Sequence, residues 1–153
     1  MDLGAVGQVL LLSALPISEL RIGLPLALSL GFSAPAAYAL AVAGNLLPVP
    51  FLLLGLRWIL PIAVGLPGPL GRWASRYLRW QERRSQARFQ RWGAWAILFF
   101  VAIPLPMTGA WTGCLAAFLL GIPVRRALPP IVLGVLAAGG IVLLASLGVI
   151  ALL

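Results

Sequence analysis

The apolar run that opens the chain, Leu3–Phe32, is interrupted in its middle by the stretch Pro16-Ile17-Ser18-Glu19-Leu20-Arg21. The apolar arms on either side are about 10 to 15 residues long, whereas a membrane-spanning helix needs about 20. Proline removes a backbone donor and opens the helical hydrogen-bond ladder. Two short helices that meet at such an unwound tip form a re-entrant hairpin, which enters and leaves the membrane on one side. The stretch therefore predicts a re-entrant hairpin 1 over residues 1–33.

A second apolar region, Trp95–Ile122, has the same organisation further along the chain. It is interrupted by Pro104-Leu105-Pro106-Met107-Thr108-Gly109 and again leaves two short arms. The pattern predicts a re-entrant hairpin 2 over residues 93–122. A transmembrane helix is expected after each hairpin, one over residues 34–62 that is broken near residues 48–50, and one over residues 127–153.

The composition indicates a membrane protein. The 153 residues are 62% hydrophobic and 9% charged, whereas soluble domains carry about 25% charged residues. A fold this apolar has no means of covering itself with polar surface in water. We therefore expect an all-α integral membrane protein, with residues 1–153 as a single membrane domain. No cleaved signal peptide is expected, because the amino terminus has no basic region.

The residues that most enzymes need are scarce in this chain. It has one cysteine, no histidine and three carboxylates, Asp2, Glu19 and Glu82. This inventory excludes a disulfide framework, a Cys/His zinc site and a Ser-His-Asp arrangement. We expect no catalytic residues, no metal and no cofactor. The remaining chemistry is binding, proton exchange and movement, which favours a transporter over an enzyme.

Basic residues gather between the two hairpins, in residues 67–92. All eleven basic residues of the chain are arginine, and four of them follow helical spacing on one face: Arg72, Arg76, Arg79 and Arg83. An amphipathic helix of this kind is expected at the membrane interface, with its arginines on anionic lipid head groups. A solvated cytoplasmic connector is an equally good interpretation. Nucleic acid is not an expected partner of so apolar a chain.

The positions of the arginines separate two topologies. If both hairpin regions crossed the membrane fully, Arg125 and Arg126 would lie opposite the basic connector, against the positive-inside rule. If both regions are re-entrant, ten of the eleven arginines lie on or near the inner face, and both termini lie outside. We therefore expect a multi-pass protein of a prokaryotic inner (cytoplasmic) membrane, with the basic connector in the cytoplasm.

The re-entrant interpretation makes the chain two copies of one unit, hairpin plus transmembrane helix, in opposite orientation. Pro16 and Pro35 are 19 residues apart, as are Pro104 and Pro123, so both pairs share an offset of 88 residues. Inverted repeats whose broken helices face each other at mid-membrane are a recurrent plan of transporters.

Glu19 and Arg21 are the most informative side chains of the sequence. An ionisable group inside an apolar segment is a functional-site hypothesis by default. Residues two apart do not face each other on a regular helix, so an unwound tip would let both turn into one cavity. Burial and a nearby arginine act on a carboxyl in opposite directions, which would let Glu19 load and release a proton. Arg21 suits bidentate phosphate binding. The alternatives are a structural ion pair that closes the hairpin and an interfacial pair at the membrane surface.

The second interruption supplies the opposing tip. Thr108, Trp111 and Thr112 would combine hydroxyls, unwound amides and a helix N-terminus into an anion site. A packing turn set by glycine and proline is an equally good explanation. Asn45 could join the same cavity, although such an asparagine more often holds neighbouring helices together. The prolines and glycine expected to shape the hairpin tips are Pro16, Pro25, Pro104, Pro106 and Gly109.

Three ordered motifs resemble those of a known family. PISELRIGLP at residues 16–25 looks like the SELR-x-x-x-P signature of the small multidrug export proteins. GNLLPVP at residues 44–50 and IPLPMTGAWTG at residues 103–113 are similar to further parts of that pattern, and Met107 departs from it where a small residue is expected. That family is thought to be distantly related to the DedA proteins, also called the VTT or SNARE-associated family. The resemblance implies opposed re-entrant hairpins and movement of polyprenyl-phosphate carriers or phospholipids between leaflets.

These observations leave three functional hypotheses. The leading one is proton-coupled translocation of an amphipathic phosphate-bearing lipid, such as a polyprenyl-phosphate carrier. In it, Arg21 and the second tip bind the head group and Glu19 carries the proton. The alternative is a small multidrug exporter of hydrophobic cations, with Glu19 as the counter-charge, and the third is a non-transporting membrane scaffold. Because one copy has little bulk to shield a polar cavity, we expect a homodimer.

Overall fold

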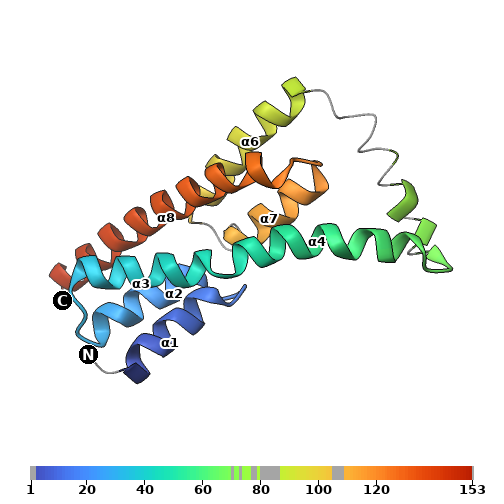
Figure 1. Cartoon of the computed structure of the whole chain (residues 1–153). Helices are drawn as coiled ribbons and strands as arrows, with labels where there is room; N and C mark the ends of the chain where they lie inside the picture. Colours follow the sequence, from blue (N-terminus) through green and yellow to red (C-terminus); the bar gives the residue numbers. More distant parts are fainter. Residues whose placement is uncertain are drawn as a thin grey trace.

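The computed structural model describes residues 3–69, 71–72, 74–76, 79, 87–104 and 109–152. Within them the chain forms seven α-helices and no β-strand, which confirms the all-α prediction (Figure 1). The helices are α1 (Leu3–Ala14), α2 (Glu19–Ser29), α3 (Ala34–Leu46), α4 (Pro48–Val64), α6 (Ala87–Ala102), α7 (Ala110–Leu119) and α8 (Val124–Leu152).

Two segments of the described residues are long and apolar enough to cross a membrane. Ala34–Ile59 has 26 residues and Val124–Gly148 has 25, so each reaches about 38 Å along its path, more than the roughly 30 Å of a hydrocarbon core. In contrast, α1, α2 and α7 have 12, 11 and 10 residues and reach only about 15 to 18 Å. Short helices of this length suit the arms of re-entrant hairpins, and the re-entrant topology itself stays a prediction.

The helix boundaries differ from the predicted segments at two places. The helix α6 runs without a break from Ala87 to Ala102, so it joins the end of the predicted connector to the first arm of hairpin 2. No proline lies between these residues to end the helix. The helix α8 begins at Val124, directly after Pro123, and not at residue 127. Residues 80–86 of the predicted connector, Arg83 among them, lie outside the described residues.

Each hairpin packs on the helix that follows it in the chain, and together they form one unit (Figure 1). The two units also contact each other. The helices α1 and α2 pack on α3, while α6 and α7 pack on α8. Between the units, α2 and α3 contact α8, and α4 contacts α7. The first long segment is interrupted at Leu47, where α3 ends and α4 begins with Pro48. Proline suits this place, because the first turn of a helix needs no N–H from it.

The turns that follow α2 and α7 share one hydrogen-bond pattern. Gly31 and Gly121 adopt left-handed φ angles of 84° and 67°, which glycine does at no steric cost. The Phe32 N–H donates to the carbonyl of Ala27 at 3.1 Å, and 90 residues later the Ile122 N–H donates to the carbonyl of Ala117 at 2.9 Å. Both bonds belong to the Schellman arrangement that ends a helix on glycine.

Small residues let the helices of each unit approach closely. A Cβ on Gly23 of α2 or on Gly44 of α3 would meet Ser13 of α1. In the second unit the corresponding glycines lie 90 residues later, and a Cβ on either would meet Val101 of α6. The four glycines are Gly23, Gly44, Gly113 and Gly134. Close approach over glycine is typical of helix packing in membranes.

These contacts correct the spacing that the prolines suggested. Ser13 and Val101, the residues of the first arms that meet the glycines, are 88 residues apart, whereas the glycines and turns beyond the tips are 90 apart. Pro35 and Pro123 are therefore not equivalent. Pro123 offers its carbonyl to Ala127 as Ser33 does to Ala37, so it corresponds to Ser33. The second tip has gained two residues (90 − 88) relative to the first, and the inverted repeat remains a prediction that these matches support.

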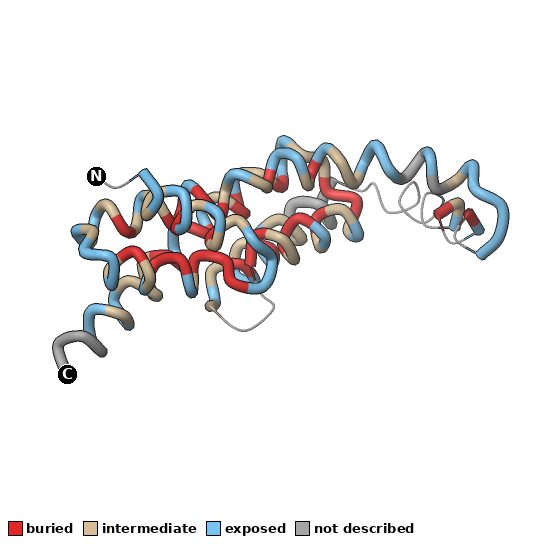
Figure 2. The backbone as a smooth tube through the Cα atoms, turned by 90° about the horizontal axis from the view of Figure 1, so that it is seen from below, coloured by how far each residue is buried: buried red, intermediate tan, exposed pale blue. Residues whose placement is uncertain are grey.

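Large apolar side chains cover the outside of the helices. In Figure 2 the buried residues follow the inner faces of the bundle and the exposed ones its outer faces. Phe51 and Trp58 of α4 are 73% and 76% exposed, and Leu144 of α8 is 72% exposed. Side chains of this size and exposure are unsuited to water and match the hydrocarbon of a bilayer.

Candidate functional site

Glu19 begins α2 in an unusual backbone conformation. Its φ is 48°, and it is the one non-glycine residue with positive φ in the described part of the chain. Its N–H donates to the carbonyl of Leu15 at 3.0 Å, and the neighbouring Ser18 hydroxyl donates to the carbonyl of Leu12. These bonds close the first tip into a tight turn. Left-handed φ is uncommon for a residue with a side chain, and strain of this kind concentrates at functional sites.

The Glu19 carboxylate rests against the second tip. Only 7% of the residue is exposed, and a Cβ added to Gly109 would collide with both carboxylate oxygens. The backbone N–H of Trp111, in the first turn of α7, donates to the carboxylate. The N-terminus of a helix carries unpaired N–H groups and a partial positive charge. Glu19 of hairpin 1 therefore caps the N-terminus of α7 in hairpin 2, where glycine leaves the space for it.

A second bond joins the tips in the opposite direction. The indole Nε1–H of Trp111 donates to the carbonyl of Ala14, the last residue of α1, at 2.9 Å. Thr112 serves α7 locally, because its hydroxyl accepts from the Gly109 N–H at 2.9 Å and donates to the Gly109 carbonyl at 3.1 Å. The two hairpins are thus held tip to tip by one carboxylate and one indole.

Asn45 faces the same place from α3. It is 1% exposed, and its Oδ1 has no hydrogen-bond partner. A cavity of about 10 Å³ is lined by Asn45 together with Glu19, Arg21 and Gly109. The remaining lining residues are Leu20, Val101, Ala110, Val135 and Ala138. The fold therefore brings Glu19, Arg21, Asn45 and the start of α7 to one polar point inside an apolar bundle.

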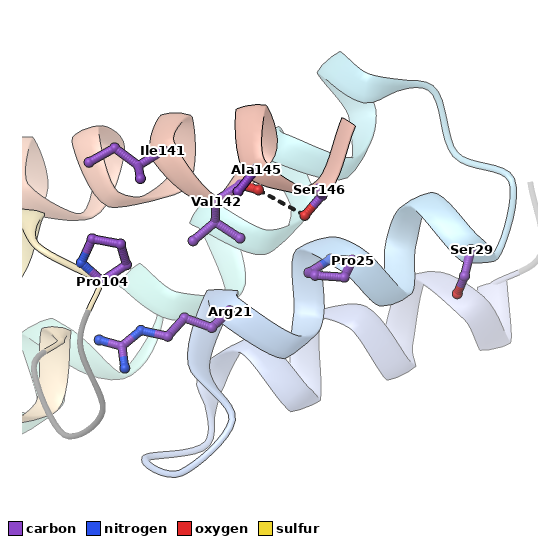
Figure 3. A pocket seen from close by; sticks show the side chains of 8 residues that line it. All are labelled: Arg21, Pro25, Ser29, Pro104, Ile141, Val142, Ala145 and Ser146. Atoms are coloured by element: carbon purple, nitrogen blue, oxygen red, sulfur yellow. Dashed lines mark hydrogen bonds between the residues drawn. The ribbon is translucent and has the colours of Figure 1, made fainter. Parts of the chain in front are cut away.

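Arg21 connects this point to a larger groove between α2 and α8. The groove measures about 650 Å³ and is lined mostly by apolar side chains (Figure 3). Its lining residues are Arg21, Pro25, Ser29, Pro104, Ile141, Val142, Ala145 and Ser146. The Ser146 hydroxyl donates to the carbonyl of Val142 in its own helix at 2.8 Å, so it adds little polarity. The groove can receive an apolar chain along α8, with the guanidinium of Arg21 as its charged element.

The other predicted site residues differ in where they lie, and two of them are not described. Thr108 and Pro106 lie outside the described residues. Pro16 lies in the exposed turn of the first tip, and Pro104 lies beside the second, where it lines the groove. Pro25 was expected at a tip, and that prediction is wrong. It lies inside α2, six residues after Glu19, because α2 begins at once after the turn and tolerates a proline on its groove face.

One packing residue, Ser13, was not predicted from the sequence. Ser13 is fully buried with no hydrogen-bond partner for its Oγ, and it fills the contact between Gly23 and Gly44. Glycine recurring among the apolar residues of short helices was the available signal for such contacts. The meeting of Glu19 with Gly109, 90 residues away, has no counterpart in local sequence.

The comparison with protein families agrees with this architecture. Residues 19–141 match the family model described as "Putative small multi-drug export protein". The match begins at Glu19, within the first tip, and includes the second tip and α8 as far as Ile141. The chain belongs to this family. Membership of the small multi-drug export family supports a transporter embedded in a membrane, as the composition predicted.

The family description bears differently on the finer hypotheses. Export of drugs, the alternative hypothesis, fits the description better than movement of a lipid phosphate does. No curated protein and no solved structure matches the chain. The predicted relationship of the small multi-drug export family to the DedA proteins is therefore not shown.

Proposed function

We propose that this member of the small multi-drug export family is a proton-coupled transporter of amphipathic anions, with a phosphate-bearing lipid as the best candidate substrate. The observation that carries the proposal is the position of Arg21. Its side chain lines both the apolar groove and the small polar cavity that holds Glu19. An arginine at the junction of an apolar groove and a helix N-terminus suits a ligand with an apolar tail and an anionic head.

The groove fits the tail of such a ligand. Its wall on α8 is formed by Ile141, Val142 and Ala145, which favour a hydrocarbon chain by burial of apolar surface. A substrate whose tail stays in the bilayer does not have to be enclosed completely. A transporter of 153 residues could therefore act on a long lipid by binding its head group alone.

Glu19 supports the coupling to protons. It is the only acidic side chain in the described part of the chain, and it lies within the polar cavity next to Arg21. Ionisable groups at this depth commonly mark proton relays in transporters. A pH gradient could act on the site through the protonation of this one carboxyl.

The test is leaflet exchange of a labelled polyprenyl phosphate in proteoliposomes with an imposed pH gradient. We expect exchange by the wild type and its loss in Glu19→Gln and Arg21→Gln. Arg125→Gln is the matched control, because Arg125 is an exposed arginine outside the groove, and it should transport normally. Equal exchange by Glu19→Gln and wild type would overturn the assigned role of Glu19.

The second candidate function is export of hydrophobic cations, which the family description favours. In it, Glu19 is the counter-charge of the drug. The same vesicles loaded with a fluorescent hydrophobic cation separate the two candidates. Movement of the cation without movement of the lipid phosphate would replace the first candidate with the second, and movement of neither would favour a scaffold.

The proposal includes an inner-membrane location, with the basic connector in the cytoplasm, and a homodimer that shields the polar point from lipid. The homodimer predicts a mass of two chains in native mass spectrometry from a mild detergent. A monomer alone under those conditions would remove the dimer from the proposal without affecting the role of Glu19.

A further inference from the structure

One buried acceptor in the polar cavity has no donor. Asn45 is 1% exposed, and its Oδ1 makes no hydrogen bond. Buried polar groups are nearly always paired, and an orphan needs an explanation. The same side chain lines the cavity that Glu19 also lines, and among the residues that line it the Glu19 carboxyl is the one that can gain or lose a hydrogen-bond donor by titration.

The two protonation states of Glu19 suit two different partners. An ionised carboxylate only accepts hydrogen bonds, whereas a protonated carboxyl has one O–H to donate. The backbone N–H of Trp111 at the start of α7 needs an acceptor, and in this structure it donates to the Glu19 carboxylate. The Oδ1 of Asn45 needs a donor. The ionised carboxylate is the stronger acceptor for the Trp111 N–H, whereas only the protonated carboxyl can donate to Asn45 Oδ1.

We propose that Asn45 Oδ1 accepts the O–H of protonated Glu19, and that the N-terminus of α7 so vacated is the binding site for the anionic head of the substrate. Glu19 occupies that N-terminus as a built-in anion until it takes up a proton. Binding of one anionic group and loading of one proton then exchange one negative charge for another beside Arg21. The site is a carboxylate-or-phosphate site of an amphipathic ligand whose tail lies in the groove on α8.

The charged groups around Glu19 are compatible with this exchange. Arg21 is the other charged residue that lines the cavity. The helices packed around it contribute only uncharged lining residues in the described part: Asn45 from α3, Val101 from α6, Gly109 and Ala110 at α7, and Val135 and Ala138 from α8. With Glu19 protonated, the positive charge of Arg21 still lies beside the cavity, and an incoming anion would lie next to it.

A single trapped water is the competing explanation for the orphan acceptor. The cavity of about 10 Å³ is near the smallest volume that holds one water. Such a water would bind Asn45 Oδ1 whether or not Glu19 is protonated. The two explanations differ in what happens to the Glu19 carboxyl when Asn45 is changed.

Infrared spectroscopy of the purified protein at a series of pH values tests the proposal without any transport. The chain has three carboxylates, Asp2, Glu19 and Glu82, so the C=O band that Glu19→Gln removes belongs to Glu19. We expect Asn45→Val to raise the frequency of that band, because the protonated carboxyl loses its acceptor. Asn45→Ser keeps an oxygen and should give an intermediate frequency, and it also covers the case in which the valine variant does not fold.

The matched control is Ser13→Ala, which removes the other buried side-chain polar atom that has no hydrogen-bond partner in the described part of the chain; Ser13 does not line the cavity. We expect it to leave the Glu19 band in place. An unchanged band in Asn45→Val and Asn45→Ser would favour the trapped water and overturn the proposal, as would an equal shift in Ser13→Ala.

The anion site itself, which rests on the proposed function, is tested by adding dodecyl phosphate to the wild type. We expect the protonated band of Glu19 to grow at fixed pH, and dodecyl trimethylammonium to leave it unchanged or reduce it. If the Asn45 variants shift the Glu19 band but dodecyl phosphate leaves it unchanged, the Glu19–Asn45 hydrogen bond is retained and the anion site is refuted. In transport assays, Asn45→Val should lower the midpoint pH by about 0.5 to 1 unit, the equivalent of one lost hydrogen bond.

Discussion

Replacing Gly109 with alanine should separate the two hairpin tips. The added Cβ would fall on the Glu19 carboxylate, which is 7% exposed and has little room to move. Glu19 would then lose its hydrogen bond from the Trp111 N–H. A hydrogen bond to a charged group contributes about 1.5 to 3 kcal/mol, and a charge at a helix N-terminus adds about 0.3 to 1 kcal/mol.

Together these terms predict that Gly109→Ala lowers the free energy of unfolding by about 2 to 4 kcal/mol. For a chain of 153 residues this corresponds to a fall in Tm of roughly 4 to 16 °C. Thermal unfolding in detergent, followed by circular dichroism, measures it. Gly140→Ala is the matched control, because a Cβ there meets nothing within 4 Å, and its Tm should stay level or rise.

A double-mutant cycle decides whether Glu19 is the cause. In a Glu19→Ala background the Cβ at residue 109 has no carboxylate to meet, so Gly109→Ala should cost no more than about 1 kcal/mol, the usual loss when alanine replaces glycine at an N-cap. The expected coupling is therefore about 2 kcal/mol. Additive effects of the two substitutions would refute the contact between the tips.

Three further predictions concern other contacts of the bundle. Gly44→Ala would place a Cβ on Ser13 and on the backbone of α1. This overpacking should cost about 2 kcal/mol and lower Tm by at least 5 °C. Gly55→Ala, with open space around it, should leave Tm unchanged. Trp111→Phe removes the 2.9 Å indole bond between the tips and should cost about 1 kcal/mol, seen as a fall in Tm of about 2 to 4 °C; an unchanged Tm would show that the bond contributes nothing net. Ala145→Trp should fill the groove on α8 and reduce transport at least tenfold in proteoliposomes while Tm stays within a few degrees, and full transport by this variant would exclude the groove as the substrate path.

The sequence predicts the kinds of helices well, because the evidence for them is local. Prolines and charges that divide an apolar run predict two short helices around a turn. The helices α1, α2 and α7 are short enough to fit this prediction. The expectation that Pro25 shapes a hairpin tip was wrong. A proline does not end a helix whose neighbours hold it in place, so tertiary packing decided its position inside α2.

The site was predictable in its charged members but not in its geometry. Glu19 and Arg21 stand out because ionisable residues are costly in apolar segments. Gly109 was expected to shape the second tip, but nothing near it in sequence indicates that it makes room for the Glu19 carboxylate. Its contact with Glu19 depends on how two hairpins meet, which is a long-range property. The missing partner of Asn45 Oδ1 likewise appears only once three helices are in place.

The spacing of 90 residues beyond the tips pairs Glu19 with Gly109. If two identical half-length chains assembled about a two-fold axis, each residue at this point would face its own copy. Two glutamates would repel, and two glycines would leave the start of each short helix without a cap. A single chain that carries both units can place a carboxylate on one side and, on the other, a glycine that leaves room for it. If the predicted inverted repeat holds, the joining of both units in one chain is what allows them to carry different residues, and so a single acid, where the two tips meet.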